Sequence, residues 1–246
     1  MLEGLERLEY RGYDSAGIAV LNDNNLTVCK TTERIKNLTE KTNGGKDIHG
    51  TTGIGHTRWA THGAPSDKNA HPHTSSDGKF AVVHNGIIEN YVALREELKA
   101  DGAEFKSETD TEVIPQLLAR CYTGDFFEAV AKTVKRLEGS YALGIICTDY
   151  PDTLIAVRKF SPLILGLSDD ANYIASDVTA IVSHTKDIMY IEDGEIAVLT
   201  PRGVKLYDGD KNELHREPAV INWDVSAAEK GGYDHFMMKE IMEQPA

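Results

Sequence analysis

The sequence contains few of the features that mark secreted, membrane-spanning or disulfide-stabilised proteins. Its 246 residues include only three cysteines, Cys29, Cys121 and Cys147, which lie far apart. This number and spacing fit a reducing compartment better than a disulfide framework. No apolar run approaches the roughly eighteen residues that a membrane-spanning helix needs, and the charged opening MLEGLERLEY lacks the pattern of a signal peptide. We therefore expect a soluble, cytoplasmic protein with no membrane partner.

Basic residues are also in short supply. The 26 lysines and arginines are outnumbered by 39 aspartates and glutamates, which gives a formal net charge of −13. Because affinity for nucleic acid depends on clustered positive charge, and no stretch gathers basic side chains, we expect no nucleic-acid partner. Repeats, low-complexity segments and a linker rich in Pro, Ser or Gly are absent as well. With 41% hydrophobic residues, the chain is predicted to form one domain over residues 1–246.

What the sequence does contain is an alternation of short apolar strands with a few amphipathic helices, which predicts an α+β fold of layered sheets and helices. Several strands are apolar throughout, which indicates that both of their faces are covered. Helices are expected over 1–10, 90–102, 109–122, 125–139 and 235–246, the last of them stopping at its Gln-Pro pair. Strands are expected over 17–22, 26–32, 52–60, 79–86, 141–148, 152–159, 163–168, 172–177, 188–193 and 195–200, with a tight turn at 192–194.

The segment GHTRWATHGAPSDKNAHPH, residues 55–73, carries four histidines, and further histidines lie nearby. A metal site is one interpretation, because His71 and His73 have the H-x-H spacing. The segment contains no cysteine, however, and its only carboxylate is Asp67, so we predict no metal. Ordinary structural hydrogen bonding is the preferred interpretation for the remaining histidines outside the pocket described next, namely His49, His56, His73, His84, His184, His215 and His235.

A pocket for an amino acid is the interpretation that the sequence favours. Arg58 lies at the predicted end of a strand, where its planar guanidinium suits a carboxylate. Thr61 and His62 add hydrogen-bonding groups. Asp110, in SETDTEV, precedes a predicted helix and can either bind an ammonium group or act as the helix N-cap, unless Thr111 is the cap.

Asn85-Gly86 follows the predicted strand 79–86 and has two interpretations. The pair is typical of a type I′ hairpin turn. The segment that follows, IIENYVALREEL, has helical rather than strand periodicity, so we favour a corner between a strand and a helix. At such a corner the side-chain amide and a backbone N–H can point at one oxygen, as in an oxyanion hole.

Taken together, the motifs LEYRGYDSAG, GIGHTRWATHG, NAHPH, VVHNGIIEN, SETDTEV and KEIMEQP resemble the glutaminase domains of the glucosamine-6-phosphate synthase branch of class II glutamine amidotransferases. The resemblance runs over nearly the whole chain in order. It implies an N-terminal-nucleophile hydrolase fold, a four-layer αββα sandwich of two mostly antiparallel sheets. It implies cofactor-free hydrolysis of L-glutamine to L-glutamate and ammonia. The ammonia would pass to a sugar-phosphate isomerase domain that makes glucosamine 6-phosphate, in a full-length enzyme that can form a homodimer.

The resemblance also assigns roles to individual residues. Arg58 would bind the α-carboxylate of glutamine and Asp110 its α-ammonium group, with Thr61 and His62 lining the pocket. Asn85 and Gly86 would form the oxyanion hole, and Trp59 would gate the ammonia route. Weaker assignments are Arg11, which would order the site, and His71, in a loop that closes near the domain interface.

One part of the family pattern is missing from this sequence. The family nucleophile is a cysteine at a free N-terminus, whose α-amino group, with a pKa of about 7.7–8.0, accepts the thiol proton. This sequence begins Met-Leu, inside an uncapped predicted helix. We expect a domain truncated at both ends relative to the family, without the isomerase domain, that hydrolyses no glutamine by itself. The alternatives are a non-catalytic glutamine-binding or regulatory module and, less favoured, a histidine-based metallohydrolase.

Overall fold

The computed structural model describes residues 1–60, 62–222, 233 and 236–243. The helices are α1 (Leu2–Leu8), α2 (Ile35–Lys41), α3 (Tyr91–Ala100), α4 (Val113–Cys121), α5 (Phe126–Val134) and α6 (Phe236–Glu243), with 3-10 helices η1 (Glu9–Arg11) and η2 (Val178–Ala180). The strands are β1 (Ser15–Asn22), β2 (Asn25–Thr31), β3 (Thr52–Arg58), β4 (His73–Thr74), β5 (Phe80–Ile88), β6 (Gly139–Cys147), β7 (Leu154–Lys159), β8 (Ile164–Leu167), β9 (Asn172–Ala175), β10 (Asp187–Tyr190), β11 (Ile196–Thr200), β12 (Gly203–Tyr207), β13 (Glu213–Leu214) and β14 (Ala219–Val220).

The strands form three sheets, and every ladder among the described residues is antiparallel. The strand orders are β2-β1-β3, β14-β10-β8-β9 and β13-β12-β11-β7-β6-β5-β4. This arrangement confirms the α+β class. None of the described helices has the length and apolar character needed to cross a bilayer.

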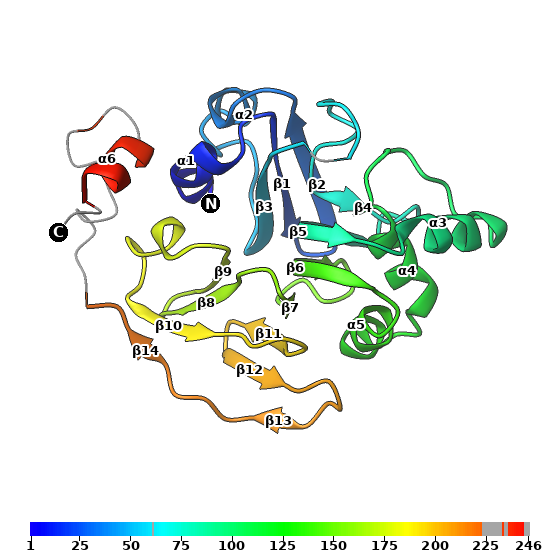
Figure 1. Cartoon of the computed structure of the whole chain (residues 1–246). Coiled ribbons are helices and arrows are strands. Elements are labelled where there is room, and N and C mark those ends of the chain that lie inside the picture. Colours follow the sequence, from blue (N-terminus) through cyan, green and yellow to red (C-terminus); the bar gives the residue numbers. More distant parts are fainter. Residues whose placement is uncertain (61, 223–232, 234–235, 244–246) are drawn as a thin grey trace.

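Helices cover one face of the seven-stranded sheet. Figure 1 shows α3, α4 and α5 together beside β5 and β6. The apolar faces predicted for these helices point at the sheet: Leu117 of α4 and Val130 of α5 are fully buried with Phe80 and Leu143 from the strands. Because this cluster excludes water from one side of β5, the position of β5 and of the polar residues at its end is held firmly.

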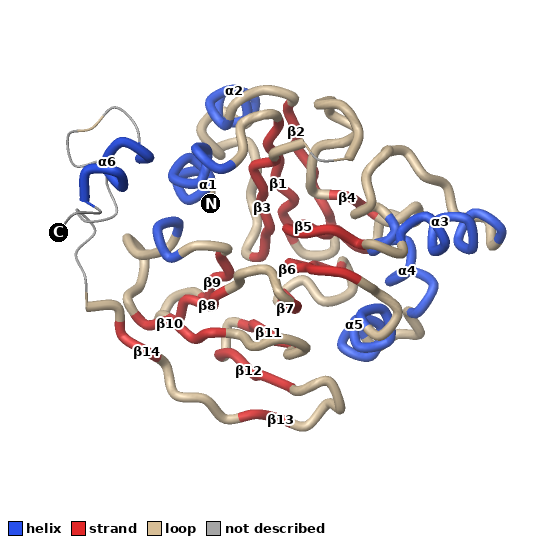
Figure 2. Tube along the Cα trace, in the orientation of Figure 1, coloured by secondary structure: helices blue, strands red, loops and turns tan. Residues whose placement is uncertain are grey.

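The other face of the seven-stranded sheet packs against the two smaller sheets. Ile54 of β3 and Leu21 of β1 are buried against Val83 of β5. The four-stranded sheet packs on β6, β7 and β11 through a second apolar cluster. On the outside, α1 and α2 cover the three-stranded sheet. Figure 2 shows α1 beside β3 and α2 at the upper end of the sheet. The layers therefore follow the predicted order of helix, sheet, sheet and helix.

The layer that faces the large sheet is divided in two. Strand β3 pairs only with β1, and β9 pairs only with β8, among the described residues. Both strands nevertheless lie over β6, since a Cβ built on Gly144 would be 2.6 Å from Ile174 of β9 and 3.5 Å from Ile54 of β3. The facing edges of β3 and β9 flank a cavity, which holds the candidate site.

Several local predictions need correction. Asn85-Gly86 is neither a hairpin turn nor a corner, because β5 continues to Ile88 and pairs these residues with Ala142 and Tyr141 of β6. The turn at 192–194 exists, but the strands on either side, β10 and β11, belong to different sheets. Five elements were not predicted from the sequence, and three of them have only two residues. They are α2, β4, β12, β13 and β14. The predicted end of the last helix at residues 244–245 lies outside the described residues.

Candidate active site

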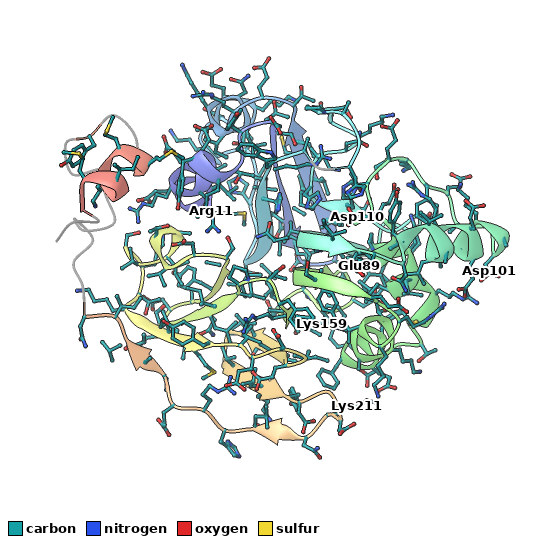
Figure 3. All side chains as sticks on the ribbon, in the orientation of Figure 1. Arg11, Glu89, Asp101, Asp110, Lys159 and Lys211 are labelled. Carbon is teal, nitrogen blue, oxygen red and sulfur yellow. The ribbon has the colours of Figure 1, made fainter. Side chains whose placement is uncertain are left out.

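A cavity of about 860 Å³ opens between β3 and β9. Residues of α1, β5, β6 and the loop before α4 complete its wall. Of the residues singled out from the sequence, it is lined by Arg11, Arg58, Trp59, His71, Asn85, Gly86 and Asp110. These residues come from separate parts of the chain, and Figure 3 shows Arg11 and Asp110 on either side of β3.

Arg58 is the last residue of β3, and only 5% of its surface is exposed. Its Nη2 donates to the carbonyl oxygens of His62 and Gly63, the latter at 3.1 Å. Its Nη1 is buried and has no hydrogen-bond partner among the described residues. Burial lowers the pKa of the guanidinium, and the negative charges of Asp14 and Asp110 oppose this effect. A buried donor without a partner is costly, so an anionic ligand that supplied an acceptor here would be strongly favoured.

Asp110 is also buried, with 4% of its surface exposed. Its Oδ2 accepts a hydrogen bond of 2.8 Å from the backbone N–H of Ile88, at the end of β5. Asp110 is not a helix N-cap: α4 begins at Val113 after Glu112, and no side chain caps it. Thr111 is not the cap either, because its hydroxyl pairs with His84 Nδ1 at 2.9 Å. The carboxylate is therefore held by β5 and not by the helix that follows it.

Asn85 and Gly86 are the sixth and seventh of the nine residues of β5, where the strand passes the cavity. Gly86 has φ of +129°, and a Cβ at this position would be 2.1 Å from the carbonyl oxygen of Ser140. Only glycine fits both requirements. The Oδ1 atom of Asn85 lies 2.8 Å from His56 Nε2.

Four histidines gather beneath these residues. The rings of His56 and His71 are 4.2 Å apart between centroids, and those of His71 and His73 are 4.9 Å apart. Burial, aided by mutual repulsion, lowers the pKa of His56 to about 4 and those of His71 and His73 well below 6.5. Burial also lowers the pKa of His84. The cluster is therefore neutral at pH 7.

The histidines of the cluster form hydrogen bonds with neighbouring groups. No group of three or more His, Cys, Asp or Glu in the described part of the chain is arranged to hold a metal ion. His73 pairs with the hydroxyl of Thr109 at 3.1 Å, in agreement with the structural interpretation made from the sequence. For His56 that interpretation missed a contact with Asn85. The period-2 alternation of β3 places His56 on the same face as Arg58, but no local pattern indicates the contact with Asn85.

The other predicted residues have different positions. Trp59 is 58% exposed at the edge of the cavity, with its ring edge-on to that of Tyr13 at 5.5 Å. His62 is not among the lining residues; its carbonyl oxygen holds Arg58, and its ring packs edge-on against Tyr91. Thr61 lies outside the described residues. Arg11 forms an ion pair of 3.1 Å with Asp177, next to η2.

The part of the chain that carries this site matches the model of a known protein family. Residues 56–183 match the model described as "Glutamine amidotransferase domain", and the match includes Arg58, Asn85, Gly86 and Asp110. The chain belongs to the glutamine amidotransferase domain family.

Relatives of this amidotransferase domain agree with the match. The chain is 58% identical over 245 residues to the glutamine–fructose-6-phosphate aminotransferase [isomerizing] of Clostridium acetobutylicum and 55% identical to that of Aquifex aeolicus. These alignments cover 100% of this chain but only 40% and 41% of the relatives, so the chain spans about two fifths of their length. Among solved structures, glutamine phosphoribosylpyrophosphate amidotransferase from B. subtilis, complexed with ADP and GMP, superimposes with a TM-score of 0.74 at 27% identity. That superposition covers 86% of this chain and 46% of the other.

The cysteines of this amidotransferase domain lie away from the cavity. Cys147 is fully buried in β6, and burial raises the pKa of its thiol to about 11. Burial also raises the pKa of Cys29 in β2. Neither these two nor Cys121 lines the cavity, and all three are free thiols. A thiol nucleophile needs thiolate character and access to substrate, which these positions do not provide.

Proposed function

We propose that this domain binds L-glutamine and forms the glutaminase part of an enzyme that makes glucosamine 6-phosphate from fructose 6-phosphate. The substrate pair comes from the names of the relatives, which are glutamine–fructose-6-phosphate aminotransferases. The observation that carries the proposal is the convergence of a buried guanidinium, Arg58, and a buried carboxylate, Asp110, on one cavity beside Asn85-Gly86.

The charges of these side chains match the two charged ends of an amino acid. The unpartnered Nη1 of Arg58 supplies a charge-assisted hydrogen bond to the α-carboxylate. Asp110 uses Oδ2 for the backbone of Ile88, and its Oδ1 can accept from the α-ammonium group. Thr61, which follows Arg58 closely in the chain, would line the amino-acid pocket, and Trp59 at the rim would close the ammonia route. His62 does not line the cavity, and its carbonyl oxygen would help to hold Arg58 in place. Arg11, through Asp177, and His71, beneath His56, would hold the wall of the cavity in place.

The side-chain amide of glutamine would then reach Asn85 and Gly86. The amide of Asn85 and a backbone N–H at Gly86 would stabilise the negative charge that develops on the carbonyl oxygen when a nucleophile attacks. One oxyanion donor of this kind lowers the activation free energy of acyl transfer by about 2.7–4 kcal/mol.

The nucleophile would come from a strand in the cavity. Among the described residues, the edges of β3 and β9 that face this space pair with no other strand. Strand β3 has seven residues, so an extended segment of similar length could pair with both. Gly53, Gly55 and Ile174 line this space, and the side chain of Met1 lies next to both glycines. A cysteine at the free N-terminus of that strand would have its own α-amino group as base.

Ammonia production and glutamine binding test the proposal separately. Because no cysteine of this sequence lines the cavity, we expect the 246-residue polypeptide to release no ammonia from glutamine. A version extended by an N-terminal strand that begins Cys-Gly should release it, and the same extension with Ala in place of that Cys should not. If the Cys version is inactive but glutamine binds, the alternative of a non-catalytic glutamine-binding or regulatory module is favoured.

Glutamine binding is measured by calorimetry on the unextended chain. Arg58→Ala should abolish binding because the α-carboxylate loses its charged partner, whereas Arg202→Ala, at an exposed turn, should not change it. Binding retained by Arg58→Ala would show that the carboxylate site lies elsewhere.

The proposal has two further parts. The three free thiols fit a reducing compartment, which supports a cytoplasmic location. The greater length of the relatives and the word "isomerizing" in their names support a sugar-phosphate isomerase domain as the partner that receives ammonia. The homodimer of the full-length enzyme is proposed from the sequence resemblance alone.

A further inference from the structure

We propose that His56 is a positioning residue that orients the side-chain amide of Asn85, so that its NH₂ group rather than its oxygen is directed at the substrate. This inference rests on the proposed glutaminase function. Asn85 can stabilise an oxyanion only as a donor, and an amide rotated by 180° would present its oxygen to the developing negative charge. Something must therefore select one of the two orientations.

His56 makes the selecting contact. The Oδ1 atom of Asn85 lies 2.8 Å from His56 Nε2. An amide oxygen only accepts hydrogen bonds, so Nε2 must carry the proton in this arrangement. With Oδ1 engaged by the ring, the Nδ2 donor of Asn85 is left for a ligand in the cavity, which both residues line.

The surroundings of the second ring nitrogen, Nδ1, also favour the tautomer with the proton on Nε2. His56 Nδ1 is buried and has no hydrogen-bond partner among the described residues. If Nε2 carries the proton, Nδ1 is an unpaired acceptor, whereas the opposite tautomer would leave a buried N–H without a partner. Buried donors without partners are rarer than under-satisfied acceptors.

The surroundings keep the ring of His56 neutral and in place. Its neighbours are the ring of His71 at 4.2 Å, the ring of His84 and the guanidinium of Arg58, and none of these favours a positive charge on His56. On the neighbouring strand β1, His56 is paired with Gly17, where a Cβ would be 2.1 Å from the carbonyl oxygen of His71. The absence of a side chain at Gly17 lets the His71 loop close over the ring.

The tautomer can be measured directly in the chain without ligand. Long-range ¹H–¹⁵N correlation spectra of histidine-labelled protein at pH 7.5 distinguish a protonated from an unprotonated ring nitrogen, and His56→Gln identifies the His56 signals. We expect Nε2 to be protonated and Nδ1 to be bare. A protonated Nδ1 with a bare Nε2 would overturn the inference, because Asn85 would then have its oxygen toward the cavity.

Two variants separate a positioning role from a merely structural one. His56→Gln keeps a terminal N–H donor near the position of Nε2, and His56→Leu removes it. We expect the Asn85 side-chain NH₂ resonances of His56→Gln to match the wild type, and those of His56→Leu to shift and broaden as the amide samples both orientations. Glutamine affinity should follow the same order, with His56→Leu roughly fivefold weaker, the equivalent of one lost hydrogen bond of about 1 kcal/mol.

The remaining outcomes are equally decisive. Unchanged Asn85 resonances and glutamine affinity in His56→Leu would overturn the inference, and so would equal losses in both variants, because a donor would then be irrelevant. If the wild-type chain binds no glutamine, the proposed function fails, while the tautomer and the Asn85 resonances still decide the role of His56.

Discussion

The buried histidine cluster makes the stability of this protein sensitive to mild acid, and His56 gives the size of the effect. Burial lowers the pKa of His56 from 6.5 to about 4. A base whose folded pKa is depressed binds fewer protons in the folded state, so its contribution to stability is full above pH 6.5 and is lost as the pH falls toward 4. Linkage gives a loss of about 1.2 kcal/mol between pH 6 and pH 5 from His56 alone, and about 2 kcal/mol between pH 7 and pH 5.

The other members of the cluster act in the same direction. The pKa values of His71, His73 and His84 are also lowered by burial, so the free energy of unfolding should fall more steeply than His56 alone requires. Burial lowers the pKa of Lys30 from 10.5 to about 8, so its contribution is lost as the pH falls from about 10.5 to 8. It therefore adds nothing to the slope between pH 7 and pH 5.

Urea unfolding followed by circular dichroism at pH 7, 6 and 5, at constant ionic strength, measures this dependence. Between pH 6 and pH 5, the free energy of unfolding of His56→Gln should fall by about 1.2 kcal/mol less than that of the wild type. The variant lacks the proton that His56 binds in the unfolded state but not in the folded state. His215→Gln, an exchange at an exposed histidine, is the matched control. Parallel pH dependences in the wild type and His56→Gln would refute the claim that His56 is buried in its neutral form.

Three further predictions concern other parts of the fold. Phe160, an exposed residue directly after β7, has φ of +63°. Because this conformation costs about 1–2 kcal/mol for a residue with a side chain, Phe160→Gly should raise the urea midpoint by the equivalent of about 1 kcal/mol; a lower midpoint would contradict this. Gly17→Ala should destabilise by about 1–3 kcal/mol, because its Cβ would be 2.1 Å from the His71 carbonyl oxygen; wild-type thermal stability would contradict it. Cys147, fully buried with a raised pKa of about 11, should resist iodoacetamide at pH 8 in the native protein, as peptide mass spectrometry can check against a sample unfolded in urea.

Much of the local structure could be predicted from the sequence, because it depends on periodicity that neighbouring residues carry. The stripe of Leu94 and Leu98 predicts α3, and the apolar run 141–147 predicts the covered strand β6, as observed. The family could be predicted as well, because its motifs are contiguous segments. Arg58 and Asp110 could be proposed for the pocket, since a charged group at the end of a strand or before a helix is a local feature.

Other features depend on contacts between distant segments, and no local pattern contains them. Asn85-Gly86 has the composition of a turn, yet nine consecutive pairings with β6 keep β5 extended through it. Asp110 has the sequence position of an N-cap, yet it binds the backbone of Ile88, 22 residues away. In the sequence, His56 has the features of an ordinary strand residue. Its contact with Asn85 forms because β3 packs on β5. The sequence by itself determined which side chains were available and which elements carry them. Tertiary structure decided which of them meet, because burial and hydrogen bonding between β3, β5 and the loop before α4 set their positions.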